Sequence, residues 1–143
     1  MTAPGFRFST DGSEIDRQRV HGWLSTSAYW ALGSTRETQE RAMDSSLNYA
    51  MFDETTGEQV AYARVITDRA TFAWLCDVFV IDEVRWRGVG VALIDGVCRE
   101  LDPYGLRRTL LATADAHGLY ARFDFEPLAQ PERWMARLAP TAD

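Results

Sequence analysis

The residues best suited to chemistry form the run Arg85-Trp-Arg-Gly-Val-Gly90, between an apolar segment and an amphipathic one. Gly88 and Gly90 bring no side chains into this turn, so several backbone N–H groups could converge on one small space as a helix begins. The first N–H groups of a helix have no partner within it, and the helix dipole is positive there. Arg85 and Arg87 add charge that suits phosphate oxygens. The run therefore predicts a site for a phosphate or pyrophosphate.

The segments on either side of this turn have the character that such a site needs. Residues 71–81 are rich in β-branched and aromatic residues, which is typical of a buried strand. After the turn, apolar residues recur at helical spacing from Val89 to Leu101, and Asp102-Pro-Tyr-Gly105 ends the helix. On these residues alone, a glycine turn that serves only tight packing is the alternative. The spacing matches neither the dinucleotide fingerprint G-x-G-x-x-G nor the P-loop.

Composition narrows the class of protein. A chain of 143 residues with 46% hydrophobic and 25% charged residues is expected to form a single domain over 1–143. No apolar run could span a bilayer and the N-terminus lacks a signal-peptide core, so we expect a cytoplasmic protein with no membrane partner. A net charge of −6 argues against nucleic-acid binding and is compatible with an amine substrate. The two cysteines and two histidines lack metal-ligand spacing, so no metal is expected.

The other expected elements follow from periodicity and turn residues. Strands are expected at 6–9, 47–53, 59–67 and 107–113, with late candidates at 125–128 and 133–138. Helices are expected after the turn at Asp11-Gly-Ser13, from a capping box at Ser34-Thr-Arg-Glu37 to about Ser46, and over 116–122. Early antiparallel strands followed by crossover helices indicate an α+β fold.

Two signatures make the chain resemble the GNAT superfamily of N-acetyltransferases. The R-x-x-G-x-G signature matches from Arg85 to Gly90, and the valine that this family has five residues earlier matches at Val80. In the later segment a strand leads to an alanine, then to Leu-Tyr at Tyr120, then to a phenylalanine before the next strand. The resemblance covers nearly the whole chain. It implies a mixed α/β fold whose central, mostly antiparallel sheet has six to seven strands, splayed at the cofactor strand and flanked by about four helices.

The resemblance also implies acetyl-CoA as the acyl donor. Backbone N–H groups from Arg87 through Gly88, Val89 and Gly90 to Val91 would hold its pyrophosphate, beside Arg85. The main chain at Val78 and Val80 would pair with the pantetheine arm as an added strand. One of these amides could also stabilise an oxyanion on the thioester. The sequence departs from the family at Trp86 and Asp124, where glycine is common, and at Thr113, where asparagine is common.

Acetyl transfer to an amine needs a neutral amine, a polarised thioester and a proton for the departing thiolate. Tyr120 matches the tyrosine that commonly donates this proton in the family. The alternative is that Tyr120 only packs between a helix and the sheet. Asp77 on the cofactor strand is a candidate base or ammonium ligand, and an ion pair with Arg64 is its alternative. His117 could relay a proton or cap its short helix.

Three aromatic residues are candidates for the acceptor pocket. Tyr29 and Trp30 lie in the loop between the first two helices, which lines that pocket in the family. They could recognise an amine by cation–π contact or anchor the loop in the core. Trp74 is expected to alternate with Cys76 and Val78 on one face of its strand, where it could wall the same pocket or pack.

These observations favour an N-acetyltransferase that works by direct attack in a ternary complex of acetyl-CoA and a primary amine. The favoured acceptor is a small-molecule amine, and a protein amine stays open. The resemblance also implies a possible homodimer, because exposed strand edges in this family often pair between subunits. A non-catalytic acyl-CoA-binding or sensing domain is the alternative, because it would keep the glycine turn without needing Tyr120.

Overall fold

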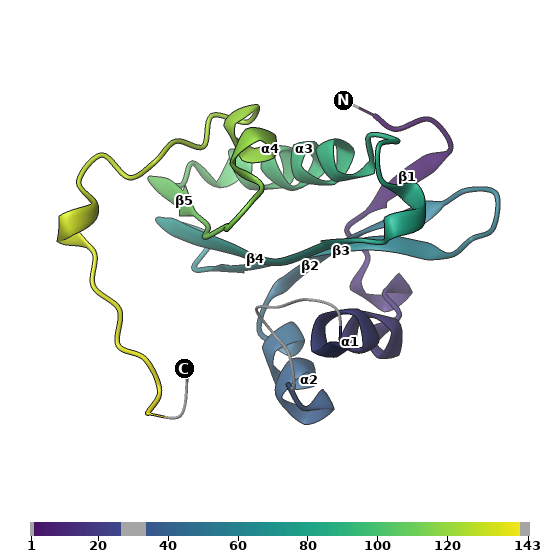
Figure 1. The fold of residues 1–143 in the computed structure, drawn as a ribbon, viewed down its shortest axis with the longest axis horizontal. Coiled ribbons are helices and arrows are strands. Elements are labelled where there is room, and N and C mark those ends of the chain that lie inside the picture. Colours follow the sequence, from purple (N-terminus) through teal and green to yellow (C-terminus); the bar gives the residue numbers. More distant parts are fainter. Residues whose placement is uncertain (1, 27–33, 141–143) are drawn as a thin grey trace.

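A computed structural model describes residues 2–26 and 34–140, and it shows one five-stranded sheet between two layers of helices (Figure 1). The sheet follows chain order: β1 (Phe6–Ser9), β2 (Leu47–Asp53), β3 (Gln59–Thr67), β4 (Phe72–Val80) and β5 (Arg108–Leu110). Neighbouring strands are antiparallel except β4 and β5, which are parallel. One face carries α1 (Arg17–Thr26) and α2 (Arg36–Asp44), and the other carries α3 (Val89–Leu101) and α4 (His117–Ala121). The expected α+β class is confirmed.

The apolar stripe of α3 forms the larger core against the sheet. Leu93, Ile94 and Val97 are almost fully buried there, because they recur on one side of the helix. Gly96 is required for this contact, since a Cβ at that position would lie 2.5 Å from the ring of Phe8 on β1. None of the described helices is long and apolar enough to cross a membrane.

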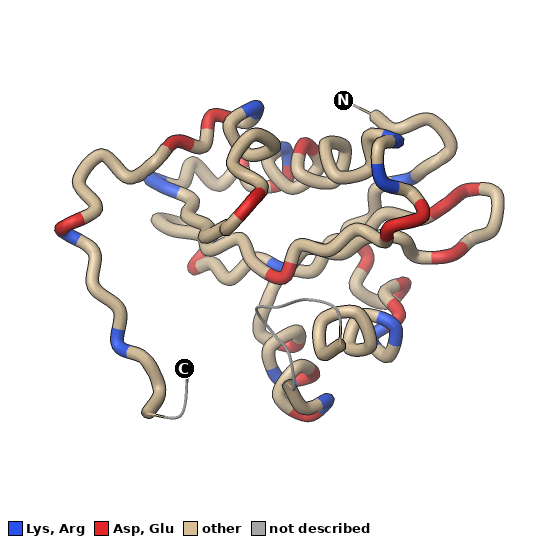
Figure 2. Tube along the Cα trace, in the orientation of Figure 1, with Lys and Arg blue, Asp and Glu red and all other residues tan. Residues whose placement is uncertain are grey.

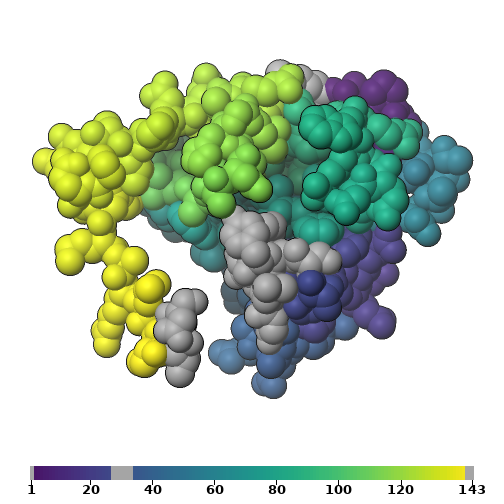
Figure 3. All heavy atoms as spheres, viewed as in Figure 1, coloured from purple at the N-terminus to yellow at the C-terminus, as the bar shows by residue number. Residues whose placement is uncertain are grey.

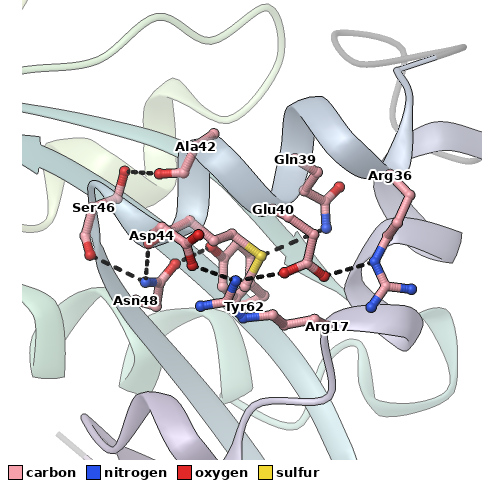
Figure 4. A network of polar contacts seen from close by, with 10 residues as sticks. Arg17, Arg36, Gln39, Glu40, Ala42, Asp44, Ser46, Asn48 and Tyr62 are labelled. Atoms are coloured by element: carbon pink, nitrogen blue, oxygen red, sulfur yellow. Dashed lines mark hydrogen bonds and ion pairs between the residues drawn. The ribbon is translucent and has the colours of Figure 1, made fainter.

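On the opposite face, α1 and α2 are joined to each other and to the sheet by polar contacts (Figure 4). Arg17 at the start of α1 donates to Glu40 at 2.6 Å and to Asp44 at 2.7 Å on α2. Deeper in the layer, the hydroxyl of Tyr62 donates to the side-chain oxygen of Asn48, and burial raises the pKa of this phenol. These contacts fix the helix pair whose connection contains the predicted acceptor residues.

Several expected boundaries shift in the structure. Thr35 rather than Ser34 caps α2, because its side chain accepts from the backbone of Thr38. Residues 125–128 and 133–138 form no strands, so the sheet that the described residues build has five strands and not six or seven. The late segments leave the sheet, and a strand needs a neighbour to pair its backbone groups.

Candidate functional site

The strands β4 and β5 separate, and this opens the edge of the sheet. They pair only where Phe72–Trp74 faces Arg108–Leu110, whereas β4 continues to Val80 with its other side paired to β3. Beyond Trp74, no strand of residues 2–26 and 34–140 pairs with the β5 side of β4, and this stretch includes Val78 and Val80. Such an edge can take an extended, amide-bearing ligand as an added strand. The predicted splay at the cofactor strand is present.

A β-bulge in β4 lies at the point of the splay. Between the pairs Tyr62–Phe79 and Arg64–Cys76, β3 has one residue where β4 has two, and Asp77 takes a φ of 52°. Such an extra residue increases the local twist of a strand. It also shifts the alternation of side chains along the rest of β4.

This shift corrects the expected alternation along the strand. Val78 packs in the core beneath α3 together with Leu75, whereas Phe79 stacks on Trp23 of α1. Trp74 alternates with Leu75 and so lies on the face opposite to Val78. The prediction that Trp74, Cys76 and Val78 share one face is therefore wrong at Val78.

Asp77 forms an ion pair with Arg64 across the bulge. The Nε of Arg64 donates to Oδ2 of Asp77 at 2.8 Å, and the two side chains are only 14% and 18% exposed. A second guanidinium nitrogen donates to the hydroxyl of Ser46 at 3.0 Å, beside the C-terminal end of α2. The structure thus forms the ion pair that the sequence left open for Asp77. The contribution of Ser46 has no signal in the sequence, because it depends on the register of β2 against β3.

The turn from β4 into α3 leaves the helix N-terminus uncapped by any side chain. Gly88 is the N-cap residue with a φ of 79°, a conformation that costs other residues about 1–2 kcal/mol. The N–H groups from Val89 to Val91 stand in the first turn of α3 and so lack intrahelical partners. The N–H of Arg87 already donates to the carbonyl of Val84 at 3.3 Å. The backbone N–H groups that make no such internal hydrogen bond therefore begin after Arg87.

Packing among the described residues does not require a glycine at position 90. A Cβ there would lie 3.9 Å from Val80 and 4.0 Å from Leu119, which are ordinary contact distances. The described residues thus leave room for a side chain at this position. The contact with Leu119 also shows that α4 lies beside this first turn of α3.

The two arginines of the turn have partners within the protein. The Nε of Arg85 lies 3.0 Å from a carboxylate oxygen of Asp82, and the guanidinium of Arg87 stacks 4.7 Å from the ring centre of Phe6. Both arginines are exposed. Figure 2 shows acidic and basic residues close together in this turn. Positive charge at the turn is therefore partly neutralised by its own acidic residues.

Tyr120 is a buried residue of the layer that contains α3 and α4. Its side chain is 8% exposed, and its ring meets that of Phe125 edge-on with centroids 5.9 Å apart. The start of its helix is fixed by Thr113, whose hydroxyl oxygen accepts from the backbone of Ala116 at 3.0 Å. Asp124 after the helix has a φ of 69°, which explains why glycine suits this position in related sequences.

The remaining predicted site residues are spread over the molecule. Trp74 is half-buried on β4, across from Ile66 on β3 and Leu110 on β5. His117 is the first residue of α4 and is exposed. Tyr29 and Trp30 lie outside the described residues.

Comparison with known proteins identifies the class. Residues 17–125 match the family described as "Acetyltransferase (GNAT) family". Because this match covers most of the sequence, the chain belongs to the GNAT family of acetyltransferases, and it is an acyltransferase. A search of curated protein sequences finds no match.

Solved structures support the same assignment. A protein of Xanthomonas campestris pv. campestris assigned to the GNAT family is 47% identical, with a TM-score of 0.90 over 97% of this chain and 96% of that one. Glucosamine-6-phosphate N-acetyltransferase from Arabidopsis thaliana is 13% identical, with a TM-score of 0.66 over 96% and 99% of the two chains. Ribosomal-protein-S18-alanine N-acetyltransferase from Escherichia coli is 18% identical, with a TM-score of 0.70 over 87% and 79%. The last two share the fold.

Proposed function

We propose that this chain transfers an acetyl group from acetyl-CoA to a primary amine by direct attack within a ternary complex. The observation that carries the proposal is the unpaired edge of β4 next to the uncapped N-terminus of α3. The residues fit acetyl-CoA for two reasons. Its pyrophosphate is an anion, which suits the open helix turn at Gly88 and Gly90. Its pantetheine arm is a chain of amides, which suits a strand edge. Val78 and Val80 would pair with the pantetheine arm.

The phosphate contacts are divided between backbone and side chains. The N–H groups of Gly88, Val89, Gly90 and Val91 would bind the pyrophosphate, because the helix dipole and the missing side chains favour an anion there. Arg85 would contribute by leaving Asp82, since an exposed ion pair of this kind contributes little stability. Arg87 contributes positive charge from its position over Phe6.

The bound acyl donor supplies an activated thioester, and this chain supplies orientation and proton transfer. A main-chain N–H of β4 near the bulge would polarise the thioester carbonyl. Tyr120 would protonate the departing sulfur from the α4 side. Asp77 would accept a proton from the amine, or bind its ammonium form, through Oδ1 while Arg64 holds Oδ2. The proposed reaction has no covalent enzyme intermediate. Burial raises the pKa of the Cys76 thiol to about 11, which disfavours the thiolate that a cysteine nucleophile needs.

The acceptor is proposed to be a small-molecule amine. An acidic chain with a net charge of −6 attracts a cationic substrate. Relatives in fold act on glucosamine 6-phosphate and on an alanine of ribosomal protein S18, as their names state, so a protein amine is the second candidate. Tyr29, Trp30 and Trp74 are the proposed wall of the acceptor pocket. We place the enzyme in the cytoplasm, where acetyl-CoA and free amines occur together.

The proposal is tested by measuring acetyl-CoA binding by calorimetry and CoA release with a panel of amines. Wild-type protein should bind and turn over, and Tyr120→Phe should keep binding while kcat falls about a hundredfold. The chain contains no lysine, so acetylation of its own lysine side chains cannot contribute to CoA release. Binding without turnover on any amine would instead support a sensing domain. Absence of binding would refute both functions.

A further inference from the structure

The C-terminal arm, residues 129–140, extends away from the rest of the molecule (Figures 1 and 3). Every residue of the arm is exposed, and the exposed fraction reaches 98% at Met135 and 72% at Leu138. Trp134 is 41% exposed, and its ring lies 5.3 Å from the guanidinium of Arg108 at the start of β5. Large apolar side chains gathered on one extended segment are typical of an interaction surface.

The arm has the pattern of a strand but no strand to pair with. Trp134, Ala136 and Leu138 fall on one side of an extended chain, and Met135 and Arg137 on the other. In the described part of the chain, residues 134–140 belong to no sheet. Their backbone groups would be paired if they were added to a free sheet edge.

A receiving surface for such a strand exists on the same molecule. β5 is the last strand of the sheet, so its outer edge is free within the described residues. Beside it, a groove of about 950 Å³ lies between the C-terminal half of α3, β5 and the segment after α4. Its apolar lining includes Leu75, Val97, Cys98, Leu111, Phe123 and Phe125.

The charges of the arm and of the groove are complementary. Acidic side chains outnumber basic ones in the groove, whose lining has Asp95, Asp102, Asp124 and Glu126 against Arg99 and Arg122. The arm carries Arg133 and Arg137 against one acidic residue, Glu132. An extended strand laid in the groove would bring these arginines to the acidic wall.

We propose that the arm of one molecule docks on a second copy of this chain, along the free edge of β5 and into the groove beside it. The contact of Trp134 with Arg108 holds the root of the arm at the start of β5, and beyond it the chain runs away from β5 and α4 (Figure 1). Residues 135–140, fully extended, span about 20 Å, which is enough to cover the short strand β5 in a partner. A reciprocal exchange gives a closed two-fold dimer.

This inference does not rest on the proposed function, although Tyr120 also lines the groove, and light scattering of the full-length protein tests it. The wild type should be a dimer at micromolar concentration, and Met135→Asp with Leu138→Asp should raise the dimer dissociation constant at least about a hundredfold. Ile66→Asp is the matched control, because Ile66 is an exposed apolar residue of β3, 45% exposed, outside both arm and groove. A monomeric wild type, or a dimer that the arm variant leaves intact, would overturn the proposal.

A second experiment locates the arm in the dimer. Single cysteines at Ala136, Arg137 and Leu138 are oxidised in the presence of the native Cys98, which lines the groove. Crosslinking should alternate along the arm and give a product of twice the chain mass on a non-reducing gel. Cys98→Ser should abolish this product. An intramolecular disulfide without the doubled mass would show that the arm occupies its own groove, and the exchange would be refuted.

Discussion

Asp77 and Tyr120 lie on opposite faces of the central sheet. Asp77 is held by Arg64 on the face that α2 covers, whereas Tyr120 is buried in the core beneath α3. Between these two faces, β4 continues beyond Trp74 without β5 beside it in the described part of the chain. In the proposed mechanism, the acyl donor therefore enters from the α3 and α4 side and the amine from the α1 and α2 side.

Gly90→Ala should separate ligand binding from folding. The protein has room for the added methyl group, and alanine is the better helix former, so stability should be unchanged or rise by up to about 1 kcal/mol. The methyl group would crowd the open turn, and affinity for CoA should fall about tenfold or more. Thermal unfolding and calorimetry check the two effects. An affinity equal to that of the wild type would show that the phosphates bind elsewhere.

Gly96→Ala is the matched change on the same helix. Its Cβ would overlap the ring of Phe8, whose nearest atom lies at 2.5 Å, so the helix or the ring must move. We expect a loss of about 1–3 kcal/mol in the free energy of unfolding, as overpacking produces. Urea denaturation measures it. Because Gly96 is remote from the glycine turn, CoA affinity of the folded variant should stay close to that of the wild type.

Two substitutions of Trp86 should isolate the backbone strain before the glycine turn. This residue has a φ of 69°, and its side chain is fully exposed, so neither change removes packing. Trp86→Gly relieves the left-handed conformation and Trp86→Ala does not. The glycine variant should be the more stable of the two by about 1 kcal/mol in denaturant unfolding. Equal stability would mean that the strain is absorbed by neighbouring residues.

The pair formed by Arg64 and Asp77 should behave as a coupled unit. Asp77→Asn leaves a largely buried guanidinium without its counter-charge and should cost about 2–3 kcal/mol of stability. The double variant with Arg64→Gln should lose less than the sum of the single losses. If Asp77 is also the base, its asparagine variant should lose about a hundredfold in kcat. A kcat loss of similar size in Arg64→Gln would instead assign the pair a structural role.

Stability should fall at alkaline pH. Burial raises the pKa of Tyr49 to about 12 and those of Cys76 and Cys98 to about 11, above their ordinary values of 10.0 and 9.0. The folded state thus favours the protonated, neutral groups. Their contribution is complete below about pH 8 and is lost as the pH rises from 9 to 12. Urea midpoints at pH 7, 9 and 11 should decrease in that order. Cys98→Ser should flatten the decrease between pH 9 and 11.

Much of the fold could be predicted because the periodic elements are also the buried ones. The apolar stripe of Val89–Leu101 and the runs at Gln59–Thr67 and Phe72–Val80 coincide with elements of the structure. The prediction of two late strands was wrong for a physical reason. A run such as 133–138 has strand character, but a strand forms only where a neighbouring edge accepts its hydrogen bonds.

The sequence alone determined the strand, the glycine turn and the helix that follows it, because these depend on local conformational preferences and on one apolar stripe. It also carried the two signatures of the family. Only the tertiary structure decided that Arg64 pairs with Asp77, that a bulge moves Val78 to the other face, and that Tyr120 is buried opposite Asp77. These relationships depend on register between strands and on which helix covers which face, and neither quantity is encoded within a single segment.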